Sequence, residues 1–217
     1  MAKVFVVGAA GKVARRLCSQ LANRGHQVIA LHRKPEQADD LAARGATPVA
    51  GDLTTLSATG LAGLMAGSDA IIFSAGAGGA GIEVTNAIDG RGLELAVEAA
   101  RIAGVSRFLL VSAFPDALRD EERSAGFENY MRVKKLADAH LVASDLDWVI
   151  VRPGTLTDAP GTGKVRADLA IPYGNVPRDD VAATLVEIVE RPEVSRVIIE
   201  LTEGATPIGD AVARLAG

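Results

Sequence analysis

The sequence predicts an α/β fold: one doubly wound parallel sheet of about seven strands with helices on both faces. Strand-like and helix-like stretches alternate along the whole chain, and the loops that join them are short. The first strand, Val4–Val7, is apolar throughout, which is typical of a strand covered on both faces. No repeat, low-complexity tail or linker divides the chain, so we expect residues 1–217 to form a single domain.

The elements follow one another in a regular order. The expected later strands are Gln27–His32, Thr47–Ala50, Ala70–Ser74, Phe108–Ser112, Trp148–Val151 and Val197–Leu201. The expected helices are Val13–Asn23, Pro35–Arg44, Leu56–Ala66, Glu83–Ala103, Glu128–Ala143, Arg178–Glu190 and Ile208–Leu215. Gly45, Gly104 and Pro192 follow three of these helices and act as stop residues.

The least regular stretch is Thr155–Pro177, which follows the sixth expected strand and is rich in glycine and proline. Ligands of open α/β sheets bind outside the carboxyl ends of the strands. We therefore expect residues 155–177 to form a substrate loop. The alternative is an irregular connection without a function of its own.

Composition narrows the functional classes. Hydrophobic residues make up 48% of the chain, enough for a large core, and a formal charge of -4 argues against general nucleic-acid binding. No apolar run has the length of a membrane span, and the chain enters its first strand too early for a signal peptide. Cys18 is the only cysteine, so we expect a cytoplasmic protein without disulfides, in which Cys18 is a small packed residue.

The turn after the first strand carries the pattern Gly8-x-x-Gly11-x-x-Ala14 and leads directly into a helix. Strand, glycine turn and helix form the layout of a dinucleotide-binding unit. Gly8 permits a sharp turn, Gly11 lets backbone amides approach a pyrophosphate, and Ala14 allows close packing of the helix. The alternative is an ordinary tight turn. The expected cofactor contacts in this stretch are Gly8, Ala10, Gly11, Lys12 and Val13.

The end of the second strand indicates which cofactor is preferred. NAD enzymes usually place Asp or Glu there to bind the ribose 2′-hydroxyl. This chain has His32, Arg33 and Lys34 instead, and Glu36 lies beyond Pro35. A guanidinium binds a 2′-phosphate through charge-assisted hydrogen bonds, so these residues predict NADP(H) in preference to NAD(H). The alternative is a solvated basic turn.

Small or polar residues also follow the third and fourth strands. Asp52 can accept a hydrogen bond from the adenine amino group, and Leu53 can cover the ring. Small residues after the fourth strand let the backbone pass close to a ribose and a nicotinamide. These residues are Ser74, Ala75, Gly76 and Ala77.

The candidate catalytic residues are Ser112, Tyr130 and Lys134. Tyr130 and Lys134 lie four residues apart, on one face of the expected helix. A free tyrosine has a pKa of about 10, and we expect the Lys134 ammonium to lower that pKa so that Tyr130 exchanges protons with a carbonyl oxygen. Ser112 could hydrogen-bond the same oxygen. The alternative is a chance occurrence of tyrosine and lysine at helical spacing.

The chain resembles an atypical short-chain dehydrogenase/reductase of the NAD(P)H-binding group related to NmrA-like and small epimerase-like proteins. The matching stretches are Gly8–Gly11, His32–Arg33, Gly51–Leu53, Ser74–Gly78, Val111–Ser112, Tyr130–Lys134 and Val149–Gly154. The resemblance implies a Rossmann-like fold with NADP(H) across the strand tips. It also implies that Lys134 contacts the nicotinamide ribose, and that Arg152 and Pro153 border the cofactor and lead into the substrate side.

These patterns lead to one main hypothesis and two alternatives. The main hypothesis is an NADP(H)-dependent oxidoreductase that acts on a small carbonyl or alcohol. The alternatives are an NADP(H)-sensing regulatory protein without turnover, and an epimerase or dehydratase acting on a small sugar-like molecule. The histidines His26, His32 and His140 are scattered, so no metal is expected. We expect a monomer, or a homodimer formed through the helices at 83–103 and 128–143.

Overall fold

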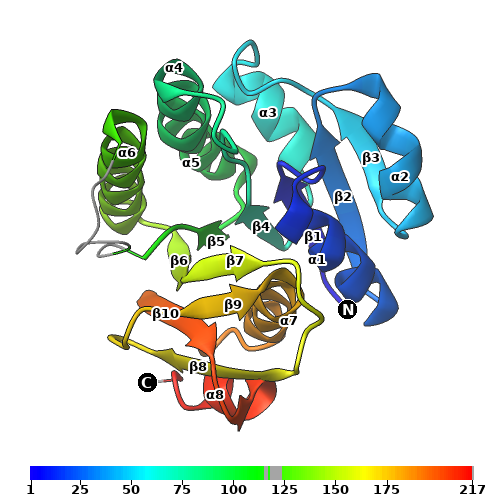
Figure 1. Cartoon of the computed structure of the whole chain (residues 1–217). Coiled ribbons are helices and arrows are strands. Elements are labelled where there is room, and N and C mark those ends of the chain that lie inside the picture. Colours follow the sequence, from blue (N-terminus) through cyan, green and yellow to red (C-terminus); the bar gives the residue numbers. More distant parts are fainter. Residues whose placement is uncertain (115–116, 118–123, 217) are drawn as a thin grey trace.

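A nine-stranded sheet forms the centre of the computed structural model, which describes residues 1–114, 117 and 124–216 (Figure 1). The strands lie in the order β11-β8-β10-β6-β5-β4-β1-β2-β3. Seven are mutually parallel: β1 (Lys3–Val7), β2 (Gln27–His32), β3 (Thr47–Ala50), β4 (Ala70–Phe73), β5 (Arg107–Val111), β6 (Asp147–Pro153) and β10 (Val197–Glu203). The order of successive strands reverses between β1 and β4, where doubly wound folds bind their ligands.

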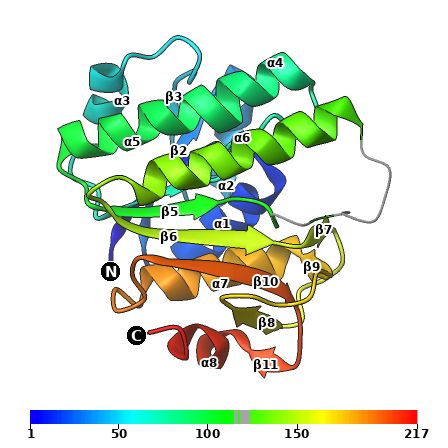
Figure 2. The same ribbon diagram turned by 90° about the vertical axis from the view of Figure 1, so that its left-hand side faces the viewer.

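Helices cover both faces of this sheet (Figure 2). One face is covered by α3 (Ala58–Met65), α5 (Gly92–Ala103) and α6 (Ala125–Val142). The other is covered by α1 (Lys12–Asn23), α2 (Ala38–Ala43), α7 (Arg178–Val189) and α8 (Ile208–Ala213). The short helices η1 (Pro35–Gln37) and α4 (Ile82–Thr85) precede α2 and α5. The predicted doubly wound α/β fold is therefore confirmed.

The strands supply two separate cores because successive side chains point to opposite faces of a sheet. In β1, Val4 and Val6 pack against α1, whereas Phe5 and Val7 pack on the side of α3 and α5. Cys18 belongs to the first core, and its burial raises the pKa of the thiol to about 12. The predicted packing role of Cys18 is confirmed. Within the described residues, no helix combines the length and the apolar character needed to cross a membrane.

The region predicted as an irregular loop at 155–177 contains strands, which corrects that interpretation. The short strands β7 (Thr155–Thr157) and β9 (Asn175–Pro177) pair with each other, and β8 (Lys164–Asp168) joins the main sheet antiparallel to β10. β11 (Thr206–Pro207) extends this antiparallel edge, so the sheet exceeds the predicted seven strands. These strands are only two to five residues long and are flanked by glycines and prolines, so they are too short to show a pattern from which strands could be predicted.

The expected helix at 83–103 is interrupted by a π-helical segment. Six residues, Asn86–Arg91, form this segment η2 between α4 and α5. A π-helical turn holds more residues than an α-helical turn, and such insertions are frequent at functional sites. The insertion changes the direction in which side chains of this stretch point, and it bears directly on the site described below.

Candidate functional site

The glycine turn between β1 and α1 lies at the carboxyl ends of the parallel strands. Gly8 has a φ of 77°, and a Cβ on Gly8 would lie 2.5 Å from the Cα of Ala75. The Gly11 amide donates to the Gly8 carbonyl at 3.0 Å, and Gly11 then caps α1 in an extended conformation. Two features therefore require glycine at position 8: its positive φ, and the close approach of the turn after β4. The first unpaired amides of α1 remain able to bind phosphate oxygens.

Two adjoining cavities open at this edge of the sheet. One has a volume of about 320 Å³ and the other about 830 Å³, and both are lined by Gly11 and by Ser74, Ala75, Gly76 and Ala77. The smaller cavity is also lined by Gly8, Ala10, His32, Arg33, Asp52 and Leu53. The larger is also lined by Lys12, Val13, Ser112, Tyr130 and Lys134. The structure therefore brings together nearly all of the predicted site residues along one elongated depression.

The smaller cavity is shaped by the turn after β2. The backbone amides of Arg33 and Lys34 donate to Oε1 of Gln37 at 3.2 and 3.0 Å, and Nδ1 of His32 donates to the Lys34 carbonyl at 3.0 Å. Gln37 also lines the cavity, and sequence reasoning missed it because it lies inside the following helical turn. Lys34 does not line either cavity, and its Nζ lies 3.9 Å from Oε1 of Glu36.

Asp52 is fixed by the residue two places after it. Its Oδ1 accepts hydrogen bonds from the amide and the hydroxyl of Thr54 at 2.9 and 2.7 Å. These bonds, with a smaller contribution from the charge of Arg33, hold the pKa of Asp52 below its usual range. Asp52 is thus a charged acceptor with a fixed orientation at the wall of the smaller cavity.

Lys134 lies inside the protein at the floor of the larger cavity. Its side chain is 4% exposed, its Nζ donates to the Val111 carbonyl at 2.9 Å, and it lies 3.8 Å from Oδ1 of Asp89. Burial lowers the pKa of Lys134 and raises the pKa of Asp89, while the two opposite charges oppose both shifts. Asp89 also lines this cavity. Sequence reasoning missed Asp89 because it treated residues 83–103 as a regular helix.

The structure contradicts the expected effect of Lys134 on Tyr130. Burial raises the pKa of the Tyr130 phenol above its ordinary value, and the negative charges of Asp89 and Asp138 raise it further. Lys134 is not among the groups that shift this pKa, and its ammonium faces Val111 and Asp89. Tyr130 is therefore a neutral phenol at neutral pH, suited to donate a proton.

Ser112 lines the same cavity as Tyr130 and directly follows β5. The residue is 5% exposed, and its Oγ has no hydrogen-bond partner among the described residues. A buried hydroxyl without a partner is unfavourable. An oxygen atom of a ligand in this cavity would relieve that cost.

Two predicted contact residues lie elsewhere. Arg152 directs its guanidinium at Asp138 of α6, with Nε and Nη2 at 2.9 and 2.8 Å from the same carboxylate oxygen. Neither Arg152 nor Pro153 lines either cavity. Arg152 thus joins β6 to α6, and no local sequence pattern predicts this contact.

A group of basic side chains borders the larger cavity. Lys12 and Arg178 both line it and both bind Asp158, at 2.9 and 3.0 Å, and Arg16 lies 3.5 Å from the same carboxylate. The hydrogen bond from Lys12 is the main reason why the pKa of Asp158 lies below its usual range. Asp158 directly follows β7, so these pairs attach the β7 segment to the starts of α1 and α7. Sequence reasoning did not identify Arg178 or Asp158.

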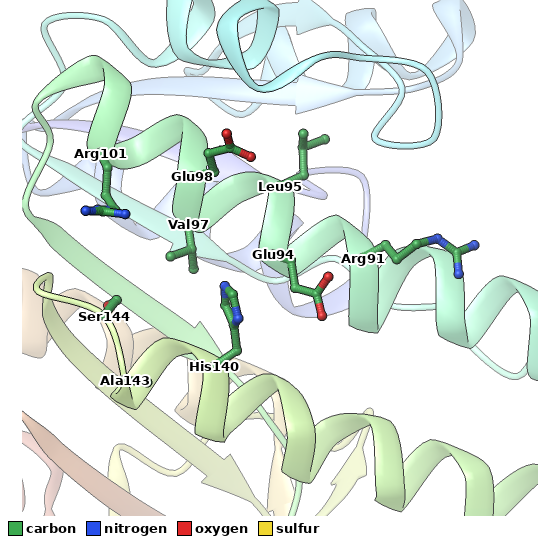
Figure 3. A pocket seen from close by; sticks show the side chains of 9 residues that line it. All are labelled: Arg91, Glu94, Leu95, Val97, Glu98, Arg101, His140, Ala143 and Ser144. Carbon is green, nitrogen blue, oxygen red and sulfur yellow. The ribbon is translucent and has the colours of Figure 1, made fainter.

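A third hollow lies between α5 and α6 (Figure 3) and shares no lining residue with the two cavities. Its volume is about 670 Å³, and His140 reaches from α6 toward Val97 and Glu94 on α5. Nowhere in the described part of the chain do three His, Cys, Asp or Glu side chains gather closely enough to hold a metal ion. This hollow is therefore separate from the strand edge where the predicted site residues gather.

The chain belongs to the NAD(P)H-binding family, whose model matches residues 8–192. It is 40% identical to the uncharacterized sugar epimerase YhfK of Bacillus subtilis (strain 168) over 215 residues, which cover 98% of this chain and 100% of that protein. A solved structure described as a putative NAD-dependent epimerase/dehydratase from Bacillus halodurans is 35% identical, with a TM-score of 0.91 and coverage of 99% and 100%. The oxidoreductase ylbE from Lactococcus lactis is 30% identical, with a TM-score of 0.84 and coverage of 98% and 96%.

Proposed function

We propose that this member of the NAD(P)H-binding family is an NADP(H)-dependent oxidoreductase that acts on a small carbonyl or alcohol. One observation carries the proposal: a continuous depression joins the glycine turn at Gly8 and Gly11 to the phenol of Tyr130 and to the hydroxyl of Ser112, which has no hydrogen-bond partner in the part of the chain that the structure describes. A dinucleotide spans such a depression, with its pyrophosphate at the start of α1. The likeness to the Lactococcus lactis oxidoreductase supports the reaction class.

The residues at the smaller cavity favour NADP(H) over NAD(H). Arg33 lines the cavity and is exposed, so its guanidinium is accessible to a 2′-phosphate. The parallel strand β2 ends without the acidic residue that would bind a ribose 2′-hydroxyl. Lys12, Ala10 and Val13 would border the pyrophosphate, while Asp52 and Leu53 would border the adenine.

The residues at the larger cavity support proton transfer to a carbonyl oxygen. NADPH, when bound, would supply hydride from C4 of its nicotinamide to the carbonyl carbon. Tyr130 would donate its phenolic proton to the carbonyl oxygen, and solvent would return the proton afterwards. Ser112 would donate a hydrogen bond to the same oxygen. Lys134 would bind the nicotinamide ribose. The phenol of Tyr130 is protonated at neutral pH, so the proton that reduction needs is present on the donor.

A fluorescence titration of the purified protein with NADPH and, separately, NADH tests the cofactor assignment. We expect NADPH to bind at least about tenfold more tightly, a difference of about 1.4 kcal/mol. A panel of small aldehydes and ketones then tests turnover through the consumption of NADPH. Equal affinity for the two cofactors would contradict the role of Arg33, and binding without turnover of any substrate would contradict the oxidoreductase.

An epimerase acting through a transient ketone is the second candidate, and the names of the two Bacillus relatives favour it. Such an enzyme regenerates its cofactor in every cycle. It would therefore convert a small sugar-like substrate without net consumption of NADPH. Product analysis by chromatography, in the presence of a catalytic amount of cofactor, separates the two candidates.

A further inference from the structure

Asp89 is the most deeply buried charged side chain of the site outside the predicted catalytic residues. The residue is 2% exposed, and it lies on the π-helical segment η2 rather than on a regular α-helix. Ionised carboxylates are rarely buried to this extent without compensating partners. The contacts of Asp89 therefore indicate what it does.

The two oxygens of Asp89 face different parts of the site. Oδ2 accepts a hydrogen bond from the amide of Ala77 at 2.9 Å, and Oδ1 lies 3.8 Å from Nζ of Lys134. A Cβ added to Gly76 would lie 3.1 Å from the same Oδ1, so the turn after β4 passes directly over the carboxylate. One side chain thus joins the β4 turn to α6.

The π-helical segment holds Asp89 in this place. It packs against α6, where a Cβ on Gly90 would lie 3.4 Å from Cγ1 of Val133, one residue before Lys134. Figure 2 shows the helix that contains α4 and α5 running beside α6. The small residue at position 90 allows the two helices to approach, which brings Asp89 within reach of Lys134.

We propose that Asp89 is a positioning residue that fixes the Gly76–Ala77 turn and the ammonium of Lys134 at the nicotinamide end of the site. The proposal rests on the proposed function, since it assigns this end of the depression to the nicotinamide and its ribose. Asp89 does not react with the substrate. It acts through the Ala77 backbone and through Lys134, both of which line the same cavity.

Charge balance supports this role. Burial favours the neutral form of Lys134, and the carboxylate of Asp89 is the nearest charge that opposes this effect. The other buried carboxylate on this side, Asp138, is bound by Arg152. Removal of the Asp89 carboxylate would leave the ammonium of Lys134 without its ion-pair partner, which is strongly unfavourable for a buried group.

The test compares two ligands that differ in the nicotinamide half. NADPH reaches both ends of the depression, whereas 2′,5′-ADP lacks the nicotinamide and its ribose. We expect Asp89→Ala to weaken the binding of NADPH by about tenfold or more, because it leaves the Ala77 amide without its acceptor and Lys134 without its ion-pair partner. Binding of 2′,5′-ADP should stay within about twofold of the wild-type value, since Lys134 lines only the larger cavity and the residues expected to bind the adenine and the 2′-phosphate line the smaller one.

Asp89→Asn replaces the alanine variant in this test if that variant fails to fold. It retains an oxygen for the Ala77 amide and removes the charge, so we expect it to lower the affinity for NADPH by about threefold or more. The matched control is Asp180→Asn, because Asp180 is also 2% exposed and also accepts backbone amides, from Thr162 and Gly163 at 2.9 Å each. Asp180→Asn should lower the melting temperature and leave the ratio of the two ligand affinities unchanged.

Several outcomes would overturn the inference. The specific role of Asp89 would be excluded if its substitution lowered the affinities for NADPH and 2′,5′-ADP equally, or changed neither. It would also be excluded if Asp180→Asn changed the ratio of the two affinities to the same extent. The failure of the proposed function has a different signature. If the wild-type protein binds NADPH without turnover and Asp89→Ala weakens NADPH alone, the oxidoreductase assignment fails and the inference holds. If the wild-type protein binds neither cofactor, both fail.

Discussion

The two ends of the depression are built by different means. The end at Gly8 and Gly11 uses backbone amides, small residues and a φ of 77° at Gly8, all within one short segment of the chain. The end at Tyr130 uses buried charges from two helices, with Asp89 and Lys134 3.8 Å apart. The first arrangement suits binding of a phosphate, and the second suits the control of a proton. Substitutions of Gly8 at the first end and of Tyr130 at the second should therefore separate affinity from turnover.

The largest effect is expected at the catalytic end. Tyr130→Phe removes the phenolic proton, and we expect it to lower kcat by about a thousandfold while NADPH affinity stays the same. The measurement is the steady-state rate of NADPH oxidation, together with a fluorescence titration. Tyr173→Phe is the control, because the Tyr173 hydroxyl bonds to Thr155 at 2.6 Å and Tyr173 lines neither cavity. Undiminished kcat in Tyr130→Phe would exclude the proposed proton donor.

The binding end should respond most to Gly8→Ala. The new Cβ would meet the backbone of Ala75 at 2.5 Å, so either the β1 turn or the β4 turn must move. We expect loss of measurable NADPH binding and destabilisation of about 3 kcal/mol in urea unfolding.

The control for Gly8→Ala separates the clash from the backbone conformation. Gly25 has a φ of 80°, close to that of Gly8, but a Cβ there would meet nothing within 4 Å. Gly25→Ala should cost only the conformational strain, about 1 kcal/mol, and leave NADPH affinity unchanged. Equal effects of the two variants would show that the approach of Ala75 does not matter.

A smaller effect at the same end distinguishes the two cofactors. Arg33→Ala should lower the affinity for NADPH by about tenfold and leave the affinity for NADH unchanged, because only NADPH carries the 2′-phosphate. Lys34→Ala is the matched control, since Lys34 is the adjacent basic residue and lines neither cavity. The measurement is the ratio of the NADPH and NADH dissociation constants. A larger change in Lys34→Ala than in Arg33→Ala would reassign the phosphate site.

The difference between the two ends also explains what the sequence could predict. The glycine turn, the parallel strands and the basic residue after β2 depend on local patterns, and their elements lie close to the expected ranges. The strands inside residues 155–177 were missed because their pairing partners are distant or very short. Arg152 was predicted to border the cofactor, but a partner from α6 holds it elsewhere.

The error at Tyr130 has the same origin. The spacing of Tyr130 and Lys134 correctly placed both residues at one cavity. It could not show that a π-helical segment brings Asp89 to Lys134, or that burial dominates the pKa of the phenol. Local spacing predicts which side chains meet, whereas the charge state of a buried group depends on every element packed around it.

The smallest predicted effect tests this charge state directly. The pKa of Tyr130 is raised above the ordinary value of about 10 in the folded protein, so above that pH the unfolded chain releases a proton that the folded chain retains. The stability from this group is therefore present below about pH 10 and decreases as pH rises, by up to about 1.4 kcal/mol per pH unit. The measurement is the free energy of urea unfolding of the wild-type protein and of Tyr130→Phe between neutral pH and a pH of about 11. The difference between the two proteins gives the contribution of the Tyr130 phenol at each pH. A stability difference that stays constant with pH would mean that the pKa of Tyr130 is the same in the folded and unfolded chains, and would contradict the effect of burial and of the two carboxylates.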